Sequence, residues 1–210
     1  DFILTNELTS YVFSEDVSAY AGFVNGFNQN YEFHHIPVKL SGISRDSTVA
    51  MPLVVQFEGG PAVCITEAAL ENYPAMYMTG ARDMENTLVS VLVPLPGEKE
   101  NKLIGQMPFR TPWRVLMIAD NPGKLIESNL VLCLNEPSKI ADASWIKPGK
   151  AAWDWWSGRL VEGKRGKPEQ GDFSNDTYKK YVDFAADSKF EYFLVDAGWY
   201  GADRDTLVDI

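Results

Sequence analysis

The hydrophobic pattern of this chain changes near Pro148 and Gly149, and that change limits the folds available to it. Before about residue 137 the apolar runs are short, often alternate with polar residues, and are separated by Gly, Pro, Asn or Asp. The runs are YVFS, YEFHHIPVKL, TVAMPLVVQF, NTLVSVLVPLPG, WRVLMIAD and NLVLCLN. Runs of this kind are typical of an antiparallel β-sandwich. The earlier part of the chain is therefore predicted to form a β-sandwich or part of one.

One segment of this region departs from the strand pattern. In ITEAALENYP, Thr66 offers an N-cap, helix-forming residues follow, and Pro74 offers a stop, so we expect one short helix there. Glu67 and Glu71 would share a face of that helix. Paired carboxylates suit a hard cation such as Ca²⁺. The alternative is that glutamate in a first helical turn is simply favoured by the helix dipole.

After Gly149 the predicted order becomes strand, loop, helix, strand. AAWDWW is a short apolar run, residues 157–171 are charged and predict a loop, and FEYFLVDAGWY predicts a buried strand. Between the loop and the second strand, Asn175 or Asp176 is expected to cap an amphipathic helix. Its apolar residues recur at helical spacing: Tyr178, Tyr181, Val182 and Ala185. A strand, a crossover helix and a second strand make a βαβ unit with parallel strands.

The length of this second region limits what it forms. About 60 residues follow Gly149, whereas a (β/α)₈ barrel takes about 250. If the region belongs to a barrel, it holds two of the eight strands.

Candidate functional side chains lie at the ends of these two strands, where βα folds gather their functional groups. Asp154, Trp155 and Trp156 follow the first strand, and Asp196 and Trp199 follow the second. An indole face packs on the apolar face of a pyranose, and a carboxylate accepts hydrogen bonds from sugar hydroxyls. The alternative for the tryptophans is that they pack a core. Asp196 points more strongly to function, because a buried carboxylate without a partner is costly.

Composition excludes several classes of partner. Nineteen Lys and Arg against 29 Asp and Glu give a formal charge of −10, which argues against nucleic acid. No apolar run approaches the length of a membrane span, and no signal-like segment opens the chain. The first residue is Asp1, so we expect the natural protein to begin earlier.

Cysteine and histidine add little chemistry. Cys64 and Cys133 each lie in an apolar, strand-like run, so we expect two buried free thiols, with a disulfide as the alternative. His34 and His35 are the only histidines, which argues against a histidine-based zinc site.

Four blocks occur together in one order: ITEAALENYPAMYM, RTPWRVLMIAD, PSKIADASWIKPGKAAWDWW and TYKKYVDFAADSKFEYFLVDAGW. In this order they resemble glycoside hydrolase family 97, a family of α-glucosidases and α-galactosidases. The resemblance implies an N-terminal β-super-sandwich, a central (β/α)₈ catalytic barrel and a small C-terminal β domain. It also implies Ca²⁺ near the active site, a terminal α-glycoside or oligosaccharide as substrate, and a periplasmic or secreted enzyme.

The resemblance assigns roles to individual residues. Glu67 resembles the glutamate that the sandwich contributes to the calcium, whereas Glu71 matches no ligand position. Asp196 resembles a substrate-binding carboxylate at the end of the second barrel strand. Trp155, Trp156 and Trp199 are expected to bind substrate with it. The catalytic carboxyl groups of the family lie on later barrel strands and loops, so no catalytic residue is expected in this chain.

Together these inferences predict an internal portion of a larger hydrolase. Residues 1–137 are the sandwich, incomplete at its N-terminal side; residues 138–149 are a linker; residues 150–210 begin the barrel and do not complete it. We expect the chain alone to be inactive and to self-associate through the exposed edge of the incomplete barrel. Membrane insertion is not expected. The alternative function is a carbohydrate-binding β-sandwich module without catalysis.

Overall fold

The chain divides into two compact units, Asp1–Ser138 and Lys139–Ile210, which are described separately. A computed structural model describes residues 1–163 and 166–199. Residues 164, 165 and 200–210 lie outside the described part, so the predicted barrel start is described only as far as residue 199. The predicted linker at 138–149 and the predicted incompleteness of the sandwich stay predictions.

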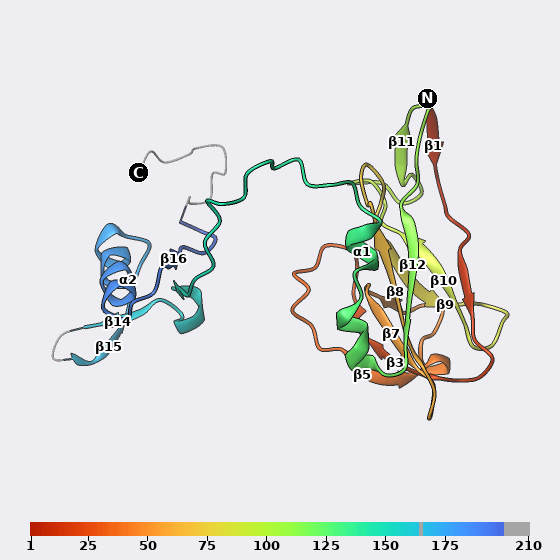
Figure 1. Cartoon of the computed structure of the whole chain (residues 1–210), viewed down its shortest axis with the longest axis horizontal. Helices are drawn as coiled ribbons and strands as arrows, with labels where there is room; N and C mark the ends of the chain where they lie inside the picture. The colour runs from red at the N-terminus through yellow and green to blue at the C-terminus, as the bar shows by residue number, and fades with distance from the viewer. Residues whose placement is uncertain (164–165, 200–210) are drawn as a thin grey trace. The chain divides into compact units, whose positions relative to one another are not determined.

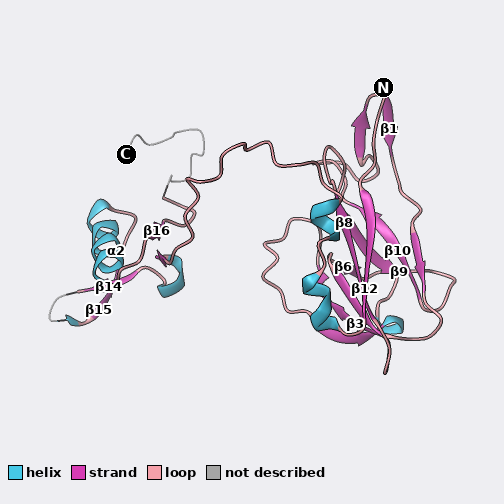
Figure 2. Cartoon of the chain, in the orientation of Figure 1, coloured by secondary structure: helices cyan, strands magenta, loops and turns pink. Residues whose placement is uncertain are grey.

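The first unit contains two five-stranded antiparallel sheets; several of their strands are labelled in Figure 1, and Figure 2 draws the strands in magenta. The first sheet has the order β2 (Ser10–Val12), β10 (Thr87–Leu92), β9 (Met76–Gly80), β6 (Thr48–Val49), β4 (Phe23–Val24). The second has the order β12 (Trp113–Ala119), β8 (Ala62–Ala68), β7 (Leu53–Gln56), β3 (Ser18–Ala21), β5 (Ile36–Lys39). A separate ribbon pairs β1 (Phe2–Leu4) with β11 (Leu103–Gly105). The predicted sandwich-like β architecture of this region is confirmed.

The main core of the first unit draws side chains from both sheets. β7 alternates buried and half-buried residues along LVVQ, as a strand with one face on a core should. β9 is buried along all five residues because neighbours pair with it and a core covers it. The shared cluster includes Leu53, Val55 and Ile65 of the second sheet and Val49, Met76, Met78 and Leu88 of the first.

Gly80 ends β9 where only a residue without a Cβ fits. A Cβ built there would lie 2.0 Å from the carbonyl oxygen of Ile43. Glycine is therefore required by the close approach of the segment that contains Ile43, which follows η1 (Leu40–Gly42).

Two local predictions in this unit were wrong. The expected helix in ITEAALENYP is absent: residues 62–68 form β8, and Ala69 and Asn72 then turn the chain with positive φ. β8 pairs with both β7 and β12, so sheet pairing overrides the helix propensity of this segment. The run NLVLCLN forms a short helix, α1 (Leu130–Cys133), instead of a strand. It follows η2 (Pro122–Glu127), and both pack beside β12 and β8.

The cysteine prediction was right in part. Both thiols are free, as expected. Cys64 is buried in β8, but Cys133 is exposed on α1, because the apolar run that contains it is not a strand of the core.

The second unit contains the predicted βαβ arrangement. β13 (Ala151–Trp153) pairs in parallel with β16 (Tyr192–Leu194), and α2 (Asn175–Asp187) lies between them in sequence. The predicted loop at 157–171 instead contains a hairpin, β14 (Leu160–Glu162) with β15 (Pro168–Gln170), and η3 (Trp155–Ser157) precedes it. The charge of the segment hid the hairpin, because short exposed strands need no apolar alternation.

The helix α2 is capped one residue earlier than predicted. The Ser174 hydroxyl accepts the Thr177 N–H, and the buried stripe is Thr177, Tyr181 and Ala185. Tyr181 stacks on Phe193 of β16 with ring centroids 5.4 Å apart, which fixes the helix against the sheet. Val182, predicted to be part of the buried face, is exposed. No described helix is both long enough and apolar enough to cross a membrane.

We expect Leu53→Ala to lower the free energy of unfolding of the first unit by about 2–5 kcal/mol, because Leu53 is fully buried between the sheets. Thiol labelling in urea measures this locally. In a Cys133→Ser background only the buried Cys64 remains, and it reacts when the sandwich opens.

Leu8→Ala is the matched control, because Leu8 is 92% exposed. In the same labelling experiment it should change the free energy of unfolding by no more than about 0.5 kcal/mol. Equal effects of the two substitutions would contradict the assignment of the core.

Candidate functional site

The strand ends of the second unit bring Asp154 and Asp196 together. The Asp154 Oδ1 atom accepts the backbone N–H of Asp196 at 3.1 Å. The Asp196 Oδ2 atom accepts the indole N–H of Trp153 at 3.2 Å, and its Oδ1 atom accepts the Ala197 N–H at 2.6 Å. Asp154 thus holds the backbone of Asp196, and the preceding residue, Trp153, holds the Asp196 side chain.

Three tryptophans stack beside this carboxylate. The Trp153 ring lies 5.2 Å from that of Trp155 and 6.4 Å from that of Trp156, with interplanar angles of 26° and 27°. Trp155 is 53% exposed and Trp156 is 80% exposed. Within the described part of the chain, core packing therefore does not account for these two indoles. Exposed, nearly parallel indole faces are surfaces on which the apolar face of a sugar ring packs.

Trp199 also lies on this strand-end segment. It is half-buried in the turn after β16, close in sequence to Asp196. The structure brings Trp155, Trp156 and Asp196 around Trp153, and it places Trp199 on the same segment as Asp196. The substrate-binding role of all four residues stays a prediction.

Asp154 is the residue whose environment sequence reasoning missed. It is fully buried, and its Oδ2 atom has no hydrogen-bond partner among the described residues. Buried carboxylates are normally paired or hydrogen-bonded through both oxygens. The available signal was its place directly after the apolar run AAW, at a strand end of a βα unit.

Other polar groups near Asp154 are also incompletely satisfied. The Tyr178 hydroxyl and the Arg159 Nε atom are buried without a partner in the described part. Burial raises the pKa of Tyr178, and the negative charge of Asp154 raises it further. Arg159 places its guanidinium 4.0 Å from the centre of the Phe173 ring.

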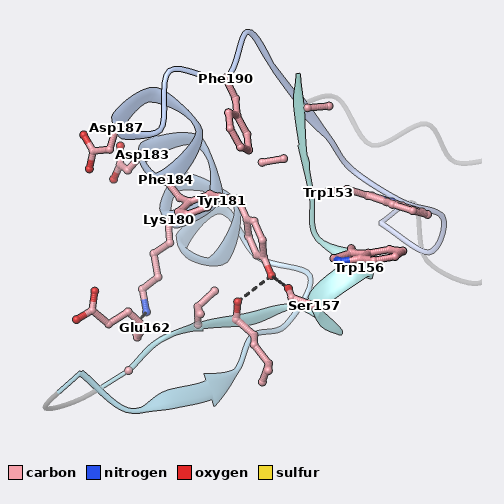
Figure 3. Close-up of a pocket in the computed structure, with 15 residues that line it drawn as sticks. Trp153, Trp156, Ser157, Glu162, Lys180, Tyr181, Asp183, Phe184, Asp187 and Phe190 are labelled. Atoms are coloured by element: carbon pink, nitrogen blue, oxygen red, sulfur yellow. Dashed lines mark hydrogen bonds between the residues drawn. The ribbon is translucent and has the colours of Figure 1, made fainter. Parts of the chain in front are cut away.

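A cavity of about 1120 Å³ lies between β13, α2 and β14 (Figure 3). Trp153 and Trp156 line it, but Trp155, Asp196 and Trp199 do not. Tyr181 spans one side, with its hydroxyl hydrogen-bonded to Ser157 Oγ at 2.6 Å and to the Leu160 carbonyl at 2.8 Å. The cavity lies on the helix side of the strands and is walled largely by apolar side chains. The strand ends, where polar groups converge, are the better candidate site.

The first unit contains a second polar cluster, centred on Arg114 of β12. Its guanidinium forms ion pairs with Glu7 and with Glu67 of β8, and all three side chains are largely buried. Glu7 also accepts the Tyr73 hydroxyl at 2.8 Å and the Thr9 hydroxyl at 2.7 Å. Sequence gave no signal for this cluster, because Glu7 and Arg114 are distant along the chain.

The two glutamates of this cluster have opposite pKa shifts. Burial raises the pKa of Glu7, but hydrogen bonds from Arg114, Thr9 and Tyr73 outweigh burial and lower it below its usual value. Burial raises the pKa of Glu67, and the Met76 N–H and Arg114 offset this only in part. Glu7 has more donors, so its charge is the better stabilised. Two carboxylates and one guanidinium leave one negative charge in excess.

These residues do not make a calcium site by themselves. The described part of the chain contains no group of three or more His, Cys, Asp or Glu that could hold a metal ion. The two oxygens of Glu67 already accept hydrogen bonds from Arg114 and from the Met76 N–H. Glu71 lies in the turn after β8 and not on a helical face with Glu67, so the predicted pairing of these glutamates was wrong.

Comparison with known proteins gives the family. Residues 1–137 match the family described as Glycosyl-hydrolase 97 N-terminal, and residues 155–210 match that described as Glycoside hydrolase 97. The chain belongs to glycoside hydrolase family 97. The resemblance stated from sequence is thereby confirmed, and the family match covers both units of this family 97 chain.

Relatives and solved structures agree with this assignment. A retaining alpha-galactosidase of Bacteroides thetaiotaomicron is 33% identical over 94% of this chain. The chain spans about one third of the length of that relative. A family 97 enzyme of Pseudoalteromonas sp. strain K8 in complex with acarbose has a TM-score of 0.73 and 30% identity, over 94% of this chain and 30% of its own. A complex of a single-residue variant of that enzyme with panose gives a TM-score of 0.72 and 31% identity, over 94% of this chain and 30% of its own.

Arg114→Met should destabilise the first unit by about 3–5 kcal/mol, because it leaves two largely buried carboxylates without their counter-charge. The difference from wild type should shrink as the pH falls from about 7 toward 4.5. Glu7, whose pKa is lowered below 4.5 in the wild type, keeps its stabilising effect over this range and loses it only at lower pH. Loss of Arg114 removes a cause that lowers the pKa of both glutamates, so their protonation as the pH falls toward 4.5 should relieve the variant more than the wild type.

The Cys64 labelling assay in urea measures both effects, because urea does not screen charges as guanidinium does. Arg45→Met is the control: the exposed Arg45–Asp46 pair is worth at most about 1 kcal/mol and less at high salt. A pH-independent cost of Arg114→Met would contradict the charge argument.

Proposed function

We propose that this chain is part of an exo-acting glycoside hydrolase that cleaves terminal α-glycosidic bonds, as an α-glucosidase or α-galactosidase. The observation that carries the proposal is the strand-end arrangement in a chain of glycoside hydrolase family 97: exposed Trp155 and Trp156 stack on Trp153, whose indole N–H bonds to Asp196. The retaining alpha-galactosidase relative supports the bond type, and the solved complexes with acarbose and panose support a carbohydrate substrate.

In this proposal Trp155, Trp156, Asp196 and Trp199 bind the sugar. The indoles supply an apolar surface, and the Asp196 carboxylate accepts hydrogen bonds from hydroxyl groups. Family membership supports an enzyme over the alternative of a binding module, since the matches extend across both units.

The chemistry itself is proposed to lie outside this chain. Glycoside hydrolysis uses two carboxyl groups that flank the scissile bond, about 5–5.5 Å apart for retention and about 6.5–9.5 Å apart for inversion. Asp154 is fully buried and bonded to the Asp196 backbone, so it does not reach a substrate in this structure. Asp196 then stands without a second accessible carboxylate at the strand ends in the described part of the chain.

Three further elements of the proposal concern the full-length enzyme and the isolated chain. Glu67 contributes one calcium ligand in the full-length enzyme, and the remaining ligands come from other parts of it. The excess negative charge around Arg114 supports this.

The resemblance alone supports a periplasmic or secreted location. The isolated chain self-associates through the open edges of the two-stranded β13–β16 sheet, since unpaired strand edges promote association.

The full-length enzyme should hydrolyse p-nitrophenyl α-galactoside or α-glucoside, whereas the 210-residue chain should hydrolyse neither. The reason is that the strand ends in residues 150–199, as far as the structure describes them, present no accessible pair of carboxyl groups. Release of nitrophenol measures both, with excess calcium and circular dichroism to show that the chain is folded. Turnover by the folded chain would contradict the proposal, because the catalytic acid and base would then lie within the 210 residues.

Glu67→Gln in the full-length enzyme should weaken calcium binding by about tenfold or more, because an amide replaces an anionic ligand. Titration calorimetry with calcium alone measures this without relying on activity. Glu71→Gln is the matched control, since Glu71 is exposed in the turn that follows β8. Unchanged calcium affinity of Glu67→Gln would remove Glu67 from the metal site.

A further inference from the structure

Asp154 connects the two segments that carry the candidate substrate-binding residues. Its backbone carbonyl accepts the Arg159 N–H at 2.7 Å and the Ser157 hydroxyl at 3.3 Å, closing the turn that carries Trp155 and Trp156. Its carboxylate accepts the Asp196 N–H at 3.1 Å from the neighbouring strand end. One buried residue thus joins the tryptophan turn to the Asp196 segment.

The contact lies beyond the regular pairing of the strands. The parallel ladder runs from Ala151 opposite Tyr192 to Trp153 opposite Leu194, and Asp196 lies two residues past its end. The ladder therefore no longer fixes the backbone at Asp196. The Asp154 carboxylate supplies the hydrogen bond there, and the Trp153 indole N–H orients the Asp196 side chain.

The Asp154 side chain has features of a positioning residue and not of a binding residue. It is fully buried, so a ligand does not reach it without opening the unit. Its Oδ2 atom is unpartnered in the described part, which makes a purely stabilising role an inefficient use of a buried charge. An unsatisfied group of this kind beside a functional carboxylate is more common at sites of function than in ordinary cores.

We infer that Asp154 is a positioning residue for substrate binding: through its bond to the Asp196 N–H it fixes where the Asp196 carboxylate meets the sugar. This rests on the proposed role of Asp196 in binding substrate. In the absence of that bond the Asp196 backbone N–H loses its partner, and the Trp153 indole holds only the side chain. The carboxylate then samples more positions, and substrate binding weakens.

The test uses the full-length enzyme with Asp154→Ala, Asp154→Asn, Asp196→Ala and the double variant Asp154→Ala/Asp196→Ala. Hydrogen exchange of the peptide that contains the Asp196 amide measures the bond directly. We expect faster exchange in Asp154→Ala and near wild-type exchange in Asp154→Asn, whose side-chain carbonyl still accepts the bond. Unchanged exchange in Asp154→Ala would overturn the inference.

Kinetics on p-nitrophenyl α-galactoside or α-glucoside, whichever is turned over, test the functional half. Asp154→Ala should raise KM by about tenfold, whereas Asp154→Asn should stay within about threefold of wild type. In the Asp196→Ala background, Asp154→Ala should change KM by less than about twofold, because the two residues act as a unit. The same tenfold effect in both backgrounds would overturn the inference.

A merely structural Asp154 would behave differently. It would lower the melting temperature and the active fraction, with KM unchanged in the enzyme that remains folded. If Asp154→Ala fails to fold, Asp154→Leu replaces it, since Leu has similar size and brings no buried charge. The exchange and KM changes expected of it are those given for Asp154→Ala, and the same results would overturn the inference. If Asp196→Ala leaves KM and kcat unchanged, the proposed role of Asp196 fails, and the exchange result separately decides the bond.

Discussion

The parallel pairing of β13 with β16 is the contact on which the candidate site depends. It places Trp153 opposite Leu194 and so brings together two strand ends that are about 40 residues apart in sequence. Parallel strands need a crossover, and α2 supplies it by burying Tyr181 against Phe193. A slip of one residue in this register would turn Phe193 away from the helix and separate Asp154 from the Asp196 backbone.

Three carboxylates show how surroundings decide what one chemical group does in this chain. Asp196 is half-buried and is aimed by the Trp153 indole toward a strand-end surface. Asp154 is fully buried, and its carboxylate accepts the backbone N–H of Asp196. Glu67 lies against a guanidinium in the sandwich, where burial raises its pKa and the counter-charge offsets this only in part. Solvent access separates the first two, and a counter-charge distinguishes the third.

Sequence predicted the parts of the fold that follow from hydrophobic period and order. The alternating runs gave the sandwich strands, and the strand, helix and strand order gave parallel pairing. Local propensity failed where distant partners decided: β8 lies between two strands, which no feature of ITEAALENYP reveals. NLVLCLN failed for the opposite reason, because an apolar run without sheet neighbours formed a short helix. The site residues were identified as strand-end groups, but the burial of Asp154 and the Arg114 cluster depend on tertiary contacts.

In the proposed function, the arrangement at the strand ends separates binding of the sugar from its cleavage. Cleavage needs two carboxyl groups that reach opposite sides of one bond, so both must be accessible from the same space. In the described part of the chain the Asp154 carboxylate is buried, and it accepts a hydrogen bond from the backbone N–H of Asp196. Asp154 and Asp196, placed in this way, do not flank a glycosidic bond. The burial that keeps Asp154 from reaching a substrate also suits it to the positioning role proposed for it beside Asp196.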